Sequence, residues 1–385
     1  MTFTKIPCVL MRGGTSKGLI INKQHLPTDP SNRNKAILRI YGSPDKRQID
    51  GVGGGTPLTS KVALIKKSDD ENIDIIYTFG QVSLFNEEID YKPTCGNMAA
   101  AVGLYAVEEG FCQPADGVTT VRIYNTNTKK VIETDVPTTR NGPVFNGDYS
   151  IDGVPGKAPR INVSFIDSGG AITGNVLPTG HVRDIVKAKS GLEYEVSVID
   201  SANTLVFVTA DQLNIAGTEI GNAFNEKSIL ATLEEIRISV GVQIGLIEKD
   251  EIVEPTSHAL PKIAVISEPA NYKSSTGIDI NRMDIDITGR YISMGTLHQA
   301  FAVSGGIAIA TAGLIPGTNV ADILSDVNGP VNIGHPSGFI EVEADVDNMN
   351  GQYVVNRATI GRTARYLMKG YCGVPSELFQ EKCYN

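Results

Sequence analysis

Residues 94–101, with the sequence TCGNMAAA, place a cysteine where an apolar helix should begin. The first N–H groups of a helix have no partner within it, and the helix dipole adds positive charge there. Such a place binds carboxylates and favours the thiolate form of a cysteine. Gly96 lets a ligand approach the backbone, and the amide of Asn97 can bind a carboxylate. We therefore predict that Cys95 donates or accepts a proton next to a bound anionic substrate, although a lone cysteine is more often structural.

Lys61 is the second candidate for proton transfer. It follows the glycine-rich loop 51–56 and lies at the start of the apolar strand candidate 60–66. Most lysines are solvated, but burial at this place would lower the pKa of the amine and suit it to remove a proton from carbon. Lys262 stands in the same way before the apolar segment 263–266. It either neutralises substrate carboxylates or is an exposed charge at a strand end, and the sequence leaves both interpretations open.

A faint repeat connects the two halves of the chain. Three short segments recur in the same order: 61–65 resembles 262–266, 95–100 resembles 294–299, and 14–17 resembles 201–204. Short apolar strands recur by chance, but three matches in one order favour two related halves that face each other across a cleft. The repeat therefore predicts a second helix start facing the first, which brings to the site Met294, Gly295, Thr296 and His298.

The loop 12–18, with the sequence RGGTSKG, is rich in glycine and basic residues. Its N–H groups and the hydroxyls of Thr15 and Ser16 can hold a carboxylate, and Arg12 and Lys17 can hold further ones. The alternative is an ordinary tight turn with exposed charges. Nucleotide motifs are absent from the sequence, because 53–61 lacks the adjacent Gly-Lys-Ser/Thr of a phosphate-binding loop and no strand leads into a GxGxxG helix start. The five histidines are far apart, so no metal site is predicted.

These side chains need strands around two apolar helices to position them. One helix is predicted over 95–109, with apolar residues at helical spacing and Gly110 as its C-terminal cap. The other is predicted from about 294 to 312 and is apolar on nearly every side, which indicates burial. Shorter helices are predicted at 36–41 and 229–243, and a hairpin turn at 126–127. Strands are predicted at 17–22, 60–66, 73–79, 119–125, 130–136, 161–166, 196–199, 205–208, 262–266, 283–287, 339–346 and 357–368.

The pattern predicts an α/β fold of two similar domains, each a curled mixed sheet around a central helix. We expect one domain over 1–180 and the other over 181–385, with the boundary in the turn-like segment 178–180. The last residues, from about 371 to 385, are expected to cross back to the first domain. A chain of 385 residues is long enough for two such cores.

Composition excludes several classes of protein. The formal net charge of −9 argues against a nucleic-acid surface. No apolar run reaches the roughly 18 residues of a transmembrane helix, and the first residues do not resemble a signal peptide. The five cysteines show no spacing typical of a disulfide framework. We therefore expect a cytoplasmic protein with a small-molecule substrate, and the sequence is compatible with a homodimer or a homotetramer.

Eight motifs together resemble the PrpF family, whose members include 2-methylaconitate cis–trans isomerase, 4-oxalomesaconate tautomerase and methylitaconate Δ-isomerase. They span nearly the whole chain in the family's order: 11–18 (MRGGTSKG), 48–54 (QIDGVGG), 59–62 (TSKV), 79–82 (FGQV), 95–97 (CGN), 200–203 (DSAN), 293–295 (SMG) and 335–338 (HPSG). The resemblance implies a diaminopimelate-epimerase-like fold with the active site between two domains, and no cofactor. It also implies that a lysine and a cysteine form the acid/base pair, which map onto Lys61 and Cys95.

The second half of the chain indicates which reaction this site carries out. Epimerases of this architecture use one cysteine from each half, but here the repeat puts Met294 at the second place, and a thioether carries no proton. We therefore expect a 1,3-proton shift in an unsaturated di- or tricarboxylate such as methylaconitate, aconitate, oxalomesaconate or methylitaconate. The two helix starts, with Asn97 and Thr296, would stabilise the dienolate. An amino-acid epimerase or racemase and a non-catalytic carboxylate-binding protein remain the alternatives, and either Lys61 or Cys95 can be the base.

Overall fold

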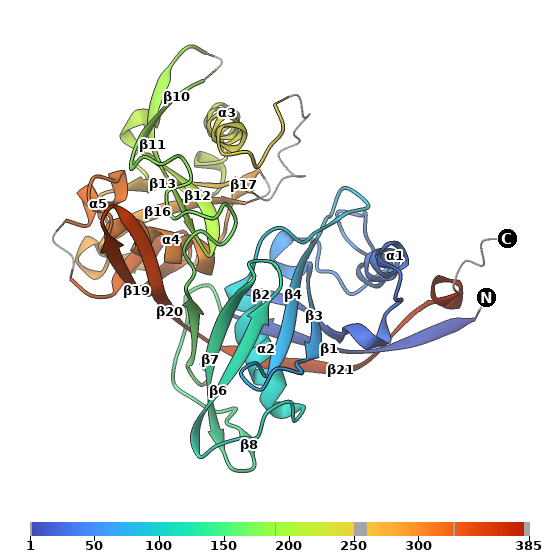
Figure 1. Ribbon diagram of the computed structural model, residues 1–385. Helices are drawn as coiled ribbons and strands as arrows, with labels where there is room; N and C mark the ends of the chain where they lie inside the picture. The colour runs from blue at the N-terminus through green and yellow to red at the C-terminus, as the bar shows by residue number, and fades with distance from the viewer. Residues whose placement is uncertain (1, 189, 250–259, 294, 326–327, 381–385) are drawn as a thin grey trace.

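The computed structural model describes residues 2–188, 190–249, 260–293, 295–325 and 328–380. In this part of the chain, one mixed sheet of 19 strands curls twice, and each curl encloses one apolar helix (Figure 1). None of the described helices is both long and apolar enough to cross a membrane. The predicted fold class, an α/β protein with two curled mixed sheets around central helices, is confirmed.

The first curl encloses helix α2 (Gly96–Glu108), which contacts most of the strands around it. Strands β2 and β3 pair in parallel, as do β4 and β6, and the other neighbours are antiparallel. Helix α1 (Pro30–Tyr41) packs on the outer face through its apolar side. The strands of this curl are β1 (Phe3–Gly13), β2 (Ser16–Asn22), β3 (Lys61–Lys67), β4 (Ile75–Val82), β6 (Gly117–Asn125), β7 (Lys130–Thr139) and β9 (Ile161–Ile166).

The second curl repeats this plan around helix α4 (Val303–Gly313). Strands β12 and β13 pair in parallel, as do β16 and β18, and helix α3 (Lys227–Gln243) packs outside. The same order of parallel and antiparallel pairs in both curls agrees with two related halves. The strands here are β10 (Asp184–Lys187), β11 (Glu193–Ser201), β12 (Asn203–Thr209), β13 (Lys262–Ser267), β16 (Ile287–Ser293), β18 (Val331–His335), β19 (Gly338–Met349) and β20 (Gln352–Arg362).

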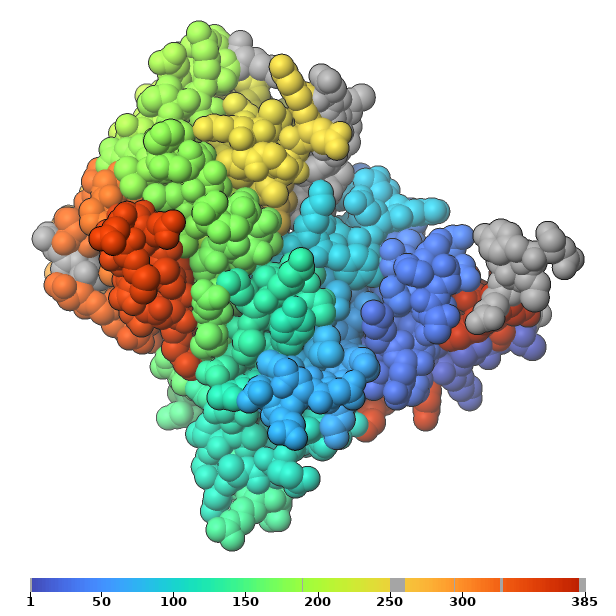
Figure 2. Space-filling model, in the orientation of Figure 1, coloured from blue at the N-terminus to red at the C-terminus, as the bar shows by residue number. Residues whose placement is uncertain are grey.

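The end of the chain ties the two curls together. Strand β20 pairs with β9 of the first curl, and β21 (Ala364–Pro375) then runs antiparallel to β1 along its whole length. Figure 2 accordingly shows red residues of the late chain both beside the second curl and beside the blue N-terminal strand. The domain boundary at about residue 180 remains a prediction. The short elements are β5 (Ile89–Asp90), β8 (Gly142–Pro143), β14 (Tyr272–Lys273), β15 (Asp279–Ile280), β17 (Thr296–Leu297) and α5 (Asn319–Ile323).

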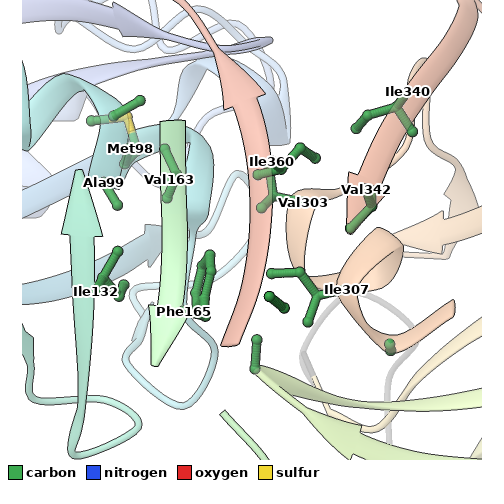
Figure 3. Packing of buried hydrophobic residues seen from close by; sticks show 14 of the residues in the cluster. Met98, Ala99, Ile132, Val163, Phe165, Val303, Ile307, Ile340, Val342 and Ile360 are labelled. Carbon is green, nitrogen blue, oxygen red and sulfur yellow. The ribbon is translucent and has the colours of Figure 1, made fainter. Parts of the chain in front are cut away.

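The two curls share one apolar core. Figure 3 shows Ile360 of β20 between Phe165 of the first curl and Ile307 of the second. Helix α2 is buried over its first twelve residues, which fits its run of alanines and glycines, because small side chains let strands approach from several directions. The added Cβ of an alanine at Gly103, for example, would lie 2.0 Å from Oγ1 of Thr134.

The predicted boundaries of α2 are confirmed, but those of the second apolar helix are wrong. Helix α4 begins at Val303 rather than near residue 294, and Ala302 is its N-cap residue. Gly295 has a φ of 74°, which suits glycine, and it lies in a tight hairpin in which Ser293 pairs with Thr296. The segment that resembled a helix start therefore belongs to this hairpin. The residue of α4 at the N-cap position, which Cys95 takes in α2, is Ala302.

Two predicted strands are also wrong in their bounds. The segment 283–287 is not a strand, because residues Arg282–Asp284 form a 3₁₀ turn and β16 begins only at Ile287. The predicted strand 357–368 is two strands, since β20 ends at Arg362 and β21 begins at Ala364. The break at Thr363 lets one strand pair with β9 and the next with β1.

Candidate active site

The N-termini of the two central helices meet at the boundary between the curls. A Cβ added to Gly96 would lie 2.5 Å from Cγ1 of Val303 and 2.9 Å from Cζ of Phe165. Only a residue without a side chain fits at this contact. Because each helix presents its positive end and its free N–H groups here, the junction attracts anions.

A cleft opens beside this junction, lined by side chains of both halves. It brings together seven of the predicted site residues, which are Ser16, Lys61, Cys95, Gly96, Asn97, Lys262 and His298. None of the lining residues, all of which are described, is acidic. Several other lining residues were not among the predicted site residues, although some of them lie in the quoted motifs; they are Phe79, Gln81, Pro93, Thr94, Asn203, Tyr291, Ser293, Ala302, Val303 and Ser304.

The remaining predicted residues lie elsewhere. Arg12, Thr15 and Lys17 line a neighbouring cavity of about 330 Å³, which Ser16 also lines. Gly295 and Thr296 belong to the β16–β17 hairpin and are not part of the cleft wall, while Met294 lies outside the described residues. Nη1 of Arg12 donates to the carbonyl oxygen of Gly14 in the same loop and to that of Thr363, between β20 and β21, at 3.0 Å each.

Lys61 lies at the start of β3 with a neutral partner. Its Nζ donates to Oε1 of Gln81 at 2.8 Å and lies 5.1 Å from the centroid of the Phe79 ring. The other end of Gln81 is fixed, because Nε2 donates to the carbonyl oxygens of Ser60 and Pro57. Burial lowers the pKa of the Lys61 amine, and the nearby Cys95 opposes this. An amide partner does not hold the ammonium form as a carboxylate would, so the lysine can act as a base.

Cys95 is the N-cap residue of α2, with extended backbone at φ −140° and ψ 101°. Its carbonyl oxygen accepts the first helical bond from Ala99 at 3.0 Å and a bond from the Tyr77 hydroxyl at 3.4 Å. The backbone bonds fix the residue, and the side chain lines the same cleft as Lys61. Lys61, from a strand, and Cys95, from a helix start, therefore line one cleft.

Asn203 joins the two helix starts. Its Oδ1 accepts from the N–H of Thr94 at 3.1 Å, and its Nδ2 donates to Oγ of Ser304 at 2.8 Å. Thr94 is held further by Asn125, whose Nδ2 donates to Oγ1 at 2.6 Å. One buried amide thus fixes the residue before Cys95 to the first turn of α4. Asn203 matches Ser16 in the repeat, but it was not among the predicted site residues.

Lys262 occupies the second half's counterpart of the Lys61 position. Its side chain is only 8 % exposed, so the alternative of an exposed strand-end charge is wrong. Burial lowers the pKa of its amine to about 7, Asp90 opposes this, and Arg237 and Lys61 add to it. Near neutral pH this amine is divided between its charged and neutral forms.

His298 contributes an uncharged ring to the cleft. Burial lowers the pKa of the imidazole to about 4, with the bond from Ala300 opposing this and the two cleft lysines adding to it. Its Nδ1 accepts from the N–H of Ala300 at 3.1 Å, so the neutral ring carries its hydrogen on Nε2. The ring also packs edge-on against Tyr291, with centroids 5.8 Å apart. His298 can therefore donate a hydrogen bond without adding a charge.

Asn97 lies in the first turn of α2, and protein groups bind its amide on both sides. Its Oδ1 accepts from Nε of Arg362 at 3.1 Å, and its Nδ2 donates to Oγ1 of Thr15 at 3.1 Å and to Oγ of Ser16 at 3.4 Å. Arg362 was not predicted. It lies at the end of β20, and nothing in its local sequence indicates that it reaches the helix start.

A model of the PrpF protein family matches residues 3–375 of the chain. The chain belongs to the PrpF family. It is 42 % identical over 372 residues to 3-methylitaconate isomerase of Eubacterium barkeri, covering 95 % of this chain and 96 % of that one. It is 36 % identical over 388 residues to 2-methyl-aconitate isomerase of Shewanella oneidensis, covering 96 % and 97 %, and 36 % identical over 371 residues to 4-oxalomesaconate tautomerase of Pseudomonas putida, covering 95 % of each.

Solved structures agree with this membership. The crystal structure of a methylitaconate-delta-isomerase matches this PrpF chain with a TM-score of 0.81 at 40 % identity, covering 100 % of this chain and 99 % of the other. A hydroxyproline epimerase from Agrobacterium vitis matches with a TM-score of 0.57 at 12 % identity, covering 98 % of this chain and 97 % of the other, which shows a shared fold alone. The predicted family and the predicted epimerase-like fold are confirmed.

Proposed function

We propose that this protein is a cofactor-independent isomerase that moves a proton and a double bond in an unsaturated di- or tricarboxylate. The observation that carries the proposal is the meeting of Lys61 and Cys95 in one cleft without acidic lining residues, at the junction of two helix N-termini. The PrpF relatives support it, because their names are those of isomerases and a tautomerase of methylitaconate, methylaconitate and oxalomesaconate.

The reaction follows from the groups in the cleft. One member of the Lys61 and Cys95 pair takes a proton from the carbon γ to a substrate carboxylate, and its electron pair delocalises into a dienolate. The other member returns a proton at the α carbon, or at the same carbon after rotation, so the double bond shifts or changes geometry. Burial lowers the pKa of Lys61, which increases the neutral fraction of its amine and favours Lys61 as the base. The two helix N-termini stabilise the dienolate charge as it develops.

The polycarboxylate is held by cations around the reacting carbon. Lys262 in the cleft binds one carboxylate in its charged form, and Arg12 and Lys17 in the neighbouring cavity hold a further one. Ser16 lines both spaces and lies between them. This arrangement favours substrates with two or three carboxylates over monocarboxylates.

A two-thiol racemase is the enzyme alternative, and the start of α4 argues against it. The N-cap position that Cys95 takes on α2 is taken by Ala302 on α4, and a methyl group exchanges no proton. The sequence analysis argued against a second catalytic thiol from Met294. In the structure Ala302 takes that position, and the conclusion is the same. Assembly as a homodimer or a homotetramer, and the cytoplasmic location, remain predictions.

Proton NMR in D₂O tests the proposal. The protein is incubated with aconitates, methylaconitates, methylitaconate and oxalomesaconate, and separately with amino acids. Deuterium uptake at an allylic carbon with a shifted double bond, lost in Lys61→Ala, is the expected result. Exchange of amino-acid α protons instead would support an epimerase, and carboxylate binding without any exchange would support a binding protein.

A further inference from the structure

A chain of hydrogen bonds runs from a buried arginine to the cleft. Arg362 is 5 % exposed, and its Nε donates to Oδ1 of Asn97 at 3.1 Å while Nη1 donates to its neighbour's carbonyl oxygen, on Gly361, at 2.8 Å. Burial lowers the pKa of the guanidinium only to about 10, so it is a cation at neutral pH. The opposite end of the Asn97 amide reaches Thr15 and Ser16.

The cation decides the direction of every bond in this chain. A guanidinium can only donate, so the amide oxygen of Asn97 must face Arg362 and the NH₂ group must face the hydroxyls. The hydroxyl of Ser16 then accepts from Nδ2, and its own hydrogen is left for another acceptor. Ser16 is 2 % exposed and lines the cleft, and within the described residues no protein group accepts this hydrogen.

Close packing holds the plane of the amide in place, and the cation decides which end carries the oxygen. Gly14 covers it with a φ of 50°, and a Cβ added there would lie 1.9 Å from Oδ1 of Asn97 and 3.1 Å from Cδ of Arg362. The turn can close over the pair only because residue 14 is glycine. The amide is therefore enclosed by the turn on one face and fixed by the cation at one end.

We propose that Arg362 is a positioning residue that orients the Asn97 amide so that the Ser16 hydroxyl donates to a carboxylate oxygen of the substrate. The inference rests on the proposed function, and it gives Asn97 an indirect part in carboxylate recognition. A chain of bonds that starts at a cation polarises each later donor, which strengthens the bond from Ser16. Without the cation the amide can turn over, and its oxygen then accepts the Ser16 hydrogen that the substrate needs.

A double-mutant cycle tests this coupling. The variants are Arg362→Gln, Ser16→Ala and the double variant, and the probe is trans-aconitate, whose dissociation constant is measured by calorimetry and needs no turnover. We expect Arg362→Gln to weaken binding roughly tenfold to a hundredfold in the wild type, as for loss of a bond to a charged group, but less than about threefold in Ser16→Ala. Equal losses in both backgrounds would overturn the inference, because a merely structural arginine costs the same without Ser16.

A matched control lies on the same strand. Arg357 of β20 is exposed, and its Nη1 pairs with Oε2 of Glu133 at 3.0 Å, away from the cleft. Arg357→Gln removes the same charge, and we expect unchanged aconitate binding. Arg362→Lys keeps a donor-only cation and should restore part of the affinity lost in Arg362→Gln. Absence of this rescue counts against the orienting role.

Asn97→Asp covers the case in which Arg362→Gln does not fold. The carboxylate has the same shape and pairs with Arg362, so the melting temperature should stay near that of the wild type. Both of its oxygens accept, so Ser16 must donate to it and not to the ligand. The new carboxylate could also weaken binding by repelling aconitate, and this repulsion would persist in Ser16→Ala. If Asn97→Asp costs less aconitate affinity in the Ser16→Ala background than in the wild type, the inference is supported. An equal loss of affinity in both backgrounds contradicts it. These affinity measurements are independent of the proton-exchange assay. Absence of proton exchange would contradict the proposed isomerase activity and would leave the binding test of Arg362 valid.

Discussion

Lys61 and Lys262 occupy the same position in the two halves of the molecule and reach the same cleft. Lys61 lies opposite Gly18 on the parallel strand β2, and Lys262 lies opposite Leu205 on the parallel strand β12. Their surroundings differ, however. Lys61 donates to a neutral amide, while Lys262 is influenced by a carboxylate, Asp90, and by other charges. The two amines therefore stand at equivalent positions with different neighbours, and we propose proton transfer for Lys61 and carboxylate binding for Lys262.

Replacing Lys61 by alanine should lower turnover of the polycarboxylate by at least about a hundredfold, since general acid–base groups contribute this much or more. The rate is measured by NMR in D₂O. The matched control is Lys66→Ala on the same strand, because Lys66 is exposed and its one ion pair among the described residues is with the exposed Asp69 at 3.5 Å. A Lys61→Ala protein that folds and keeps the wild-type rate would remove Lys61 from the mechanism.

Cys95→Ala should separate binding from catalysis. The helix start and its N–H groups do not depend on the thiol, so trans-aconitate should bind to within a few-fold of the wild-type affinity. Proton exchange should fall by about a hundredfold or more. Cys112→Ala is the control, because that half-buried thiol lies outside the cleft and burial raises its pKa to about 11. Undiminished exchange in Cys95→Ala would show that Lys61 works with another group.

How far the sequence predicted this site depended on whether each signal was local. The start of α2 was predicted correctly because a cap position and an apolar period lie within one segment, and Lys262 was found because the repeat keeps its strand context. The start of α4 was misplaced, because Gly295 resembles the glycine of a helix start in sequence. Its hairpin depends on the pairing of β17 with β16, which the local sequence does not indicate. Arg362 lies 265 residues from Asn97, and long-range pairing of β20 with β9 and of β21 with β1 brings it there.

The lowered pKa of Lys262 predicts how binding changes with pH. The groups that act on it are Asp90, Arg237, Lys61 and Glu234, with burial as the main cause of a pKa of about 7. The ammonium form binds carboxylate, so the affinity for trans-aconitate should be highest below about pH 7 and fall as the pH rises through it. A ligand carboxylate raises this pKa in the complex, so the fall continues above pH 7.

Lys262→Arg provides the comparison. Arginine stays charged over the range from about pH 6 to about pH 9, so this variant should lose most of the pH dependence of binding in that range. His298 does not confuse the result, because its pKa of about 4 leaves it neutral throughout. If the wild type and Lys262→Arg show the same pH profile, another group is responsible.

The same shift has a consequence for stability. The folded pKa of Lys262, about 7, lies below its ordinary value of 10.5, so between these values the unfolded state binds more protons. The free energy of unfolding should therefore rise with pH from about 7 to about 10, and this contribution is lost below pH 7. Lys262→Met removes the group, so urea unfolding at several pH values should show a flatter profile for the variant. An unchanged slope would mean that the amine is hydrated in solution.

Gly96→Ala tests the contact between the two helix starts. Its new methyl group would lie 2.5 Å from Cγ1 of Val303 and 2.9 Å from Cζ of Phe165, so the helices must move apart. We expect a loss of about 1–3 kcal/mol in the free energy of unfolding, as for other overpacked cores, measured by urea denaturation. Trimming the opposing side chain with Val303→Ala should cost stability alone but should recover part of the loss when combined with Gly96→Ala. Strictly additive effects would show that the two helix starts do not press on each other, and the joint anion site built on their contact would lose its support.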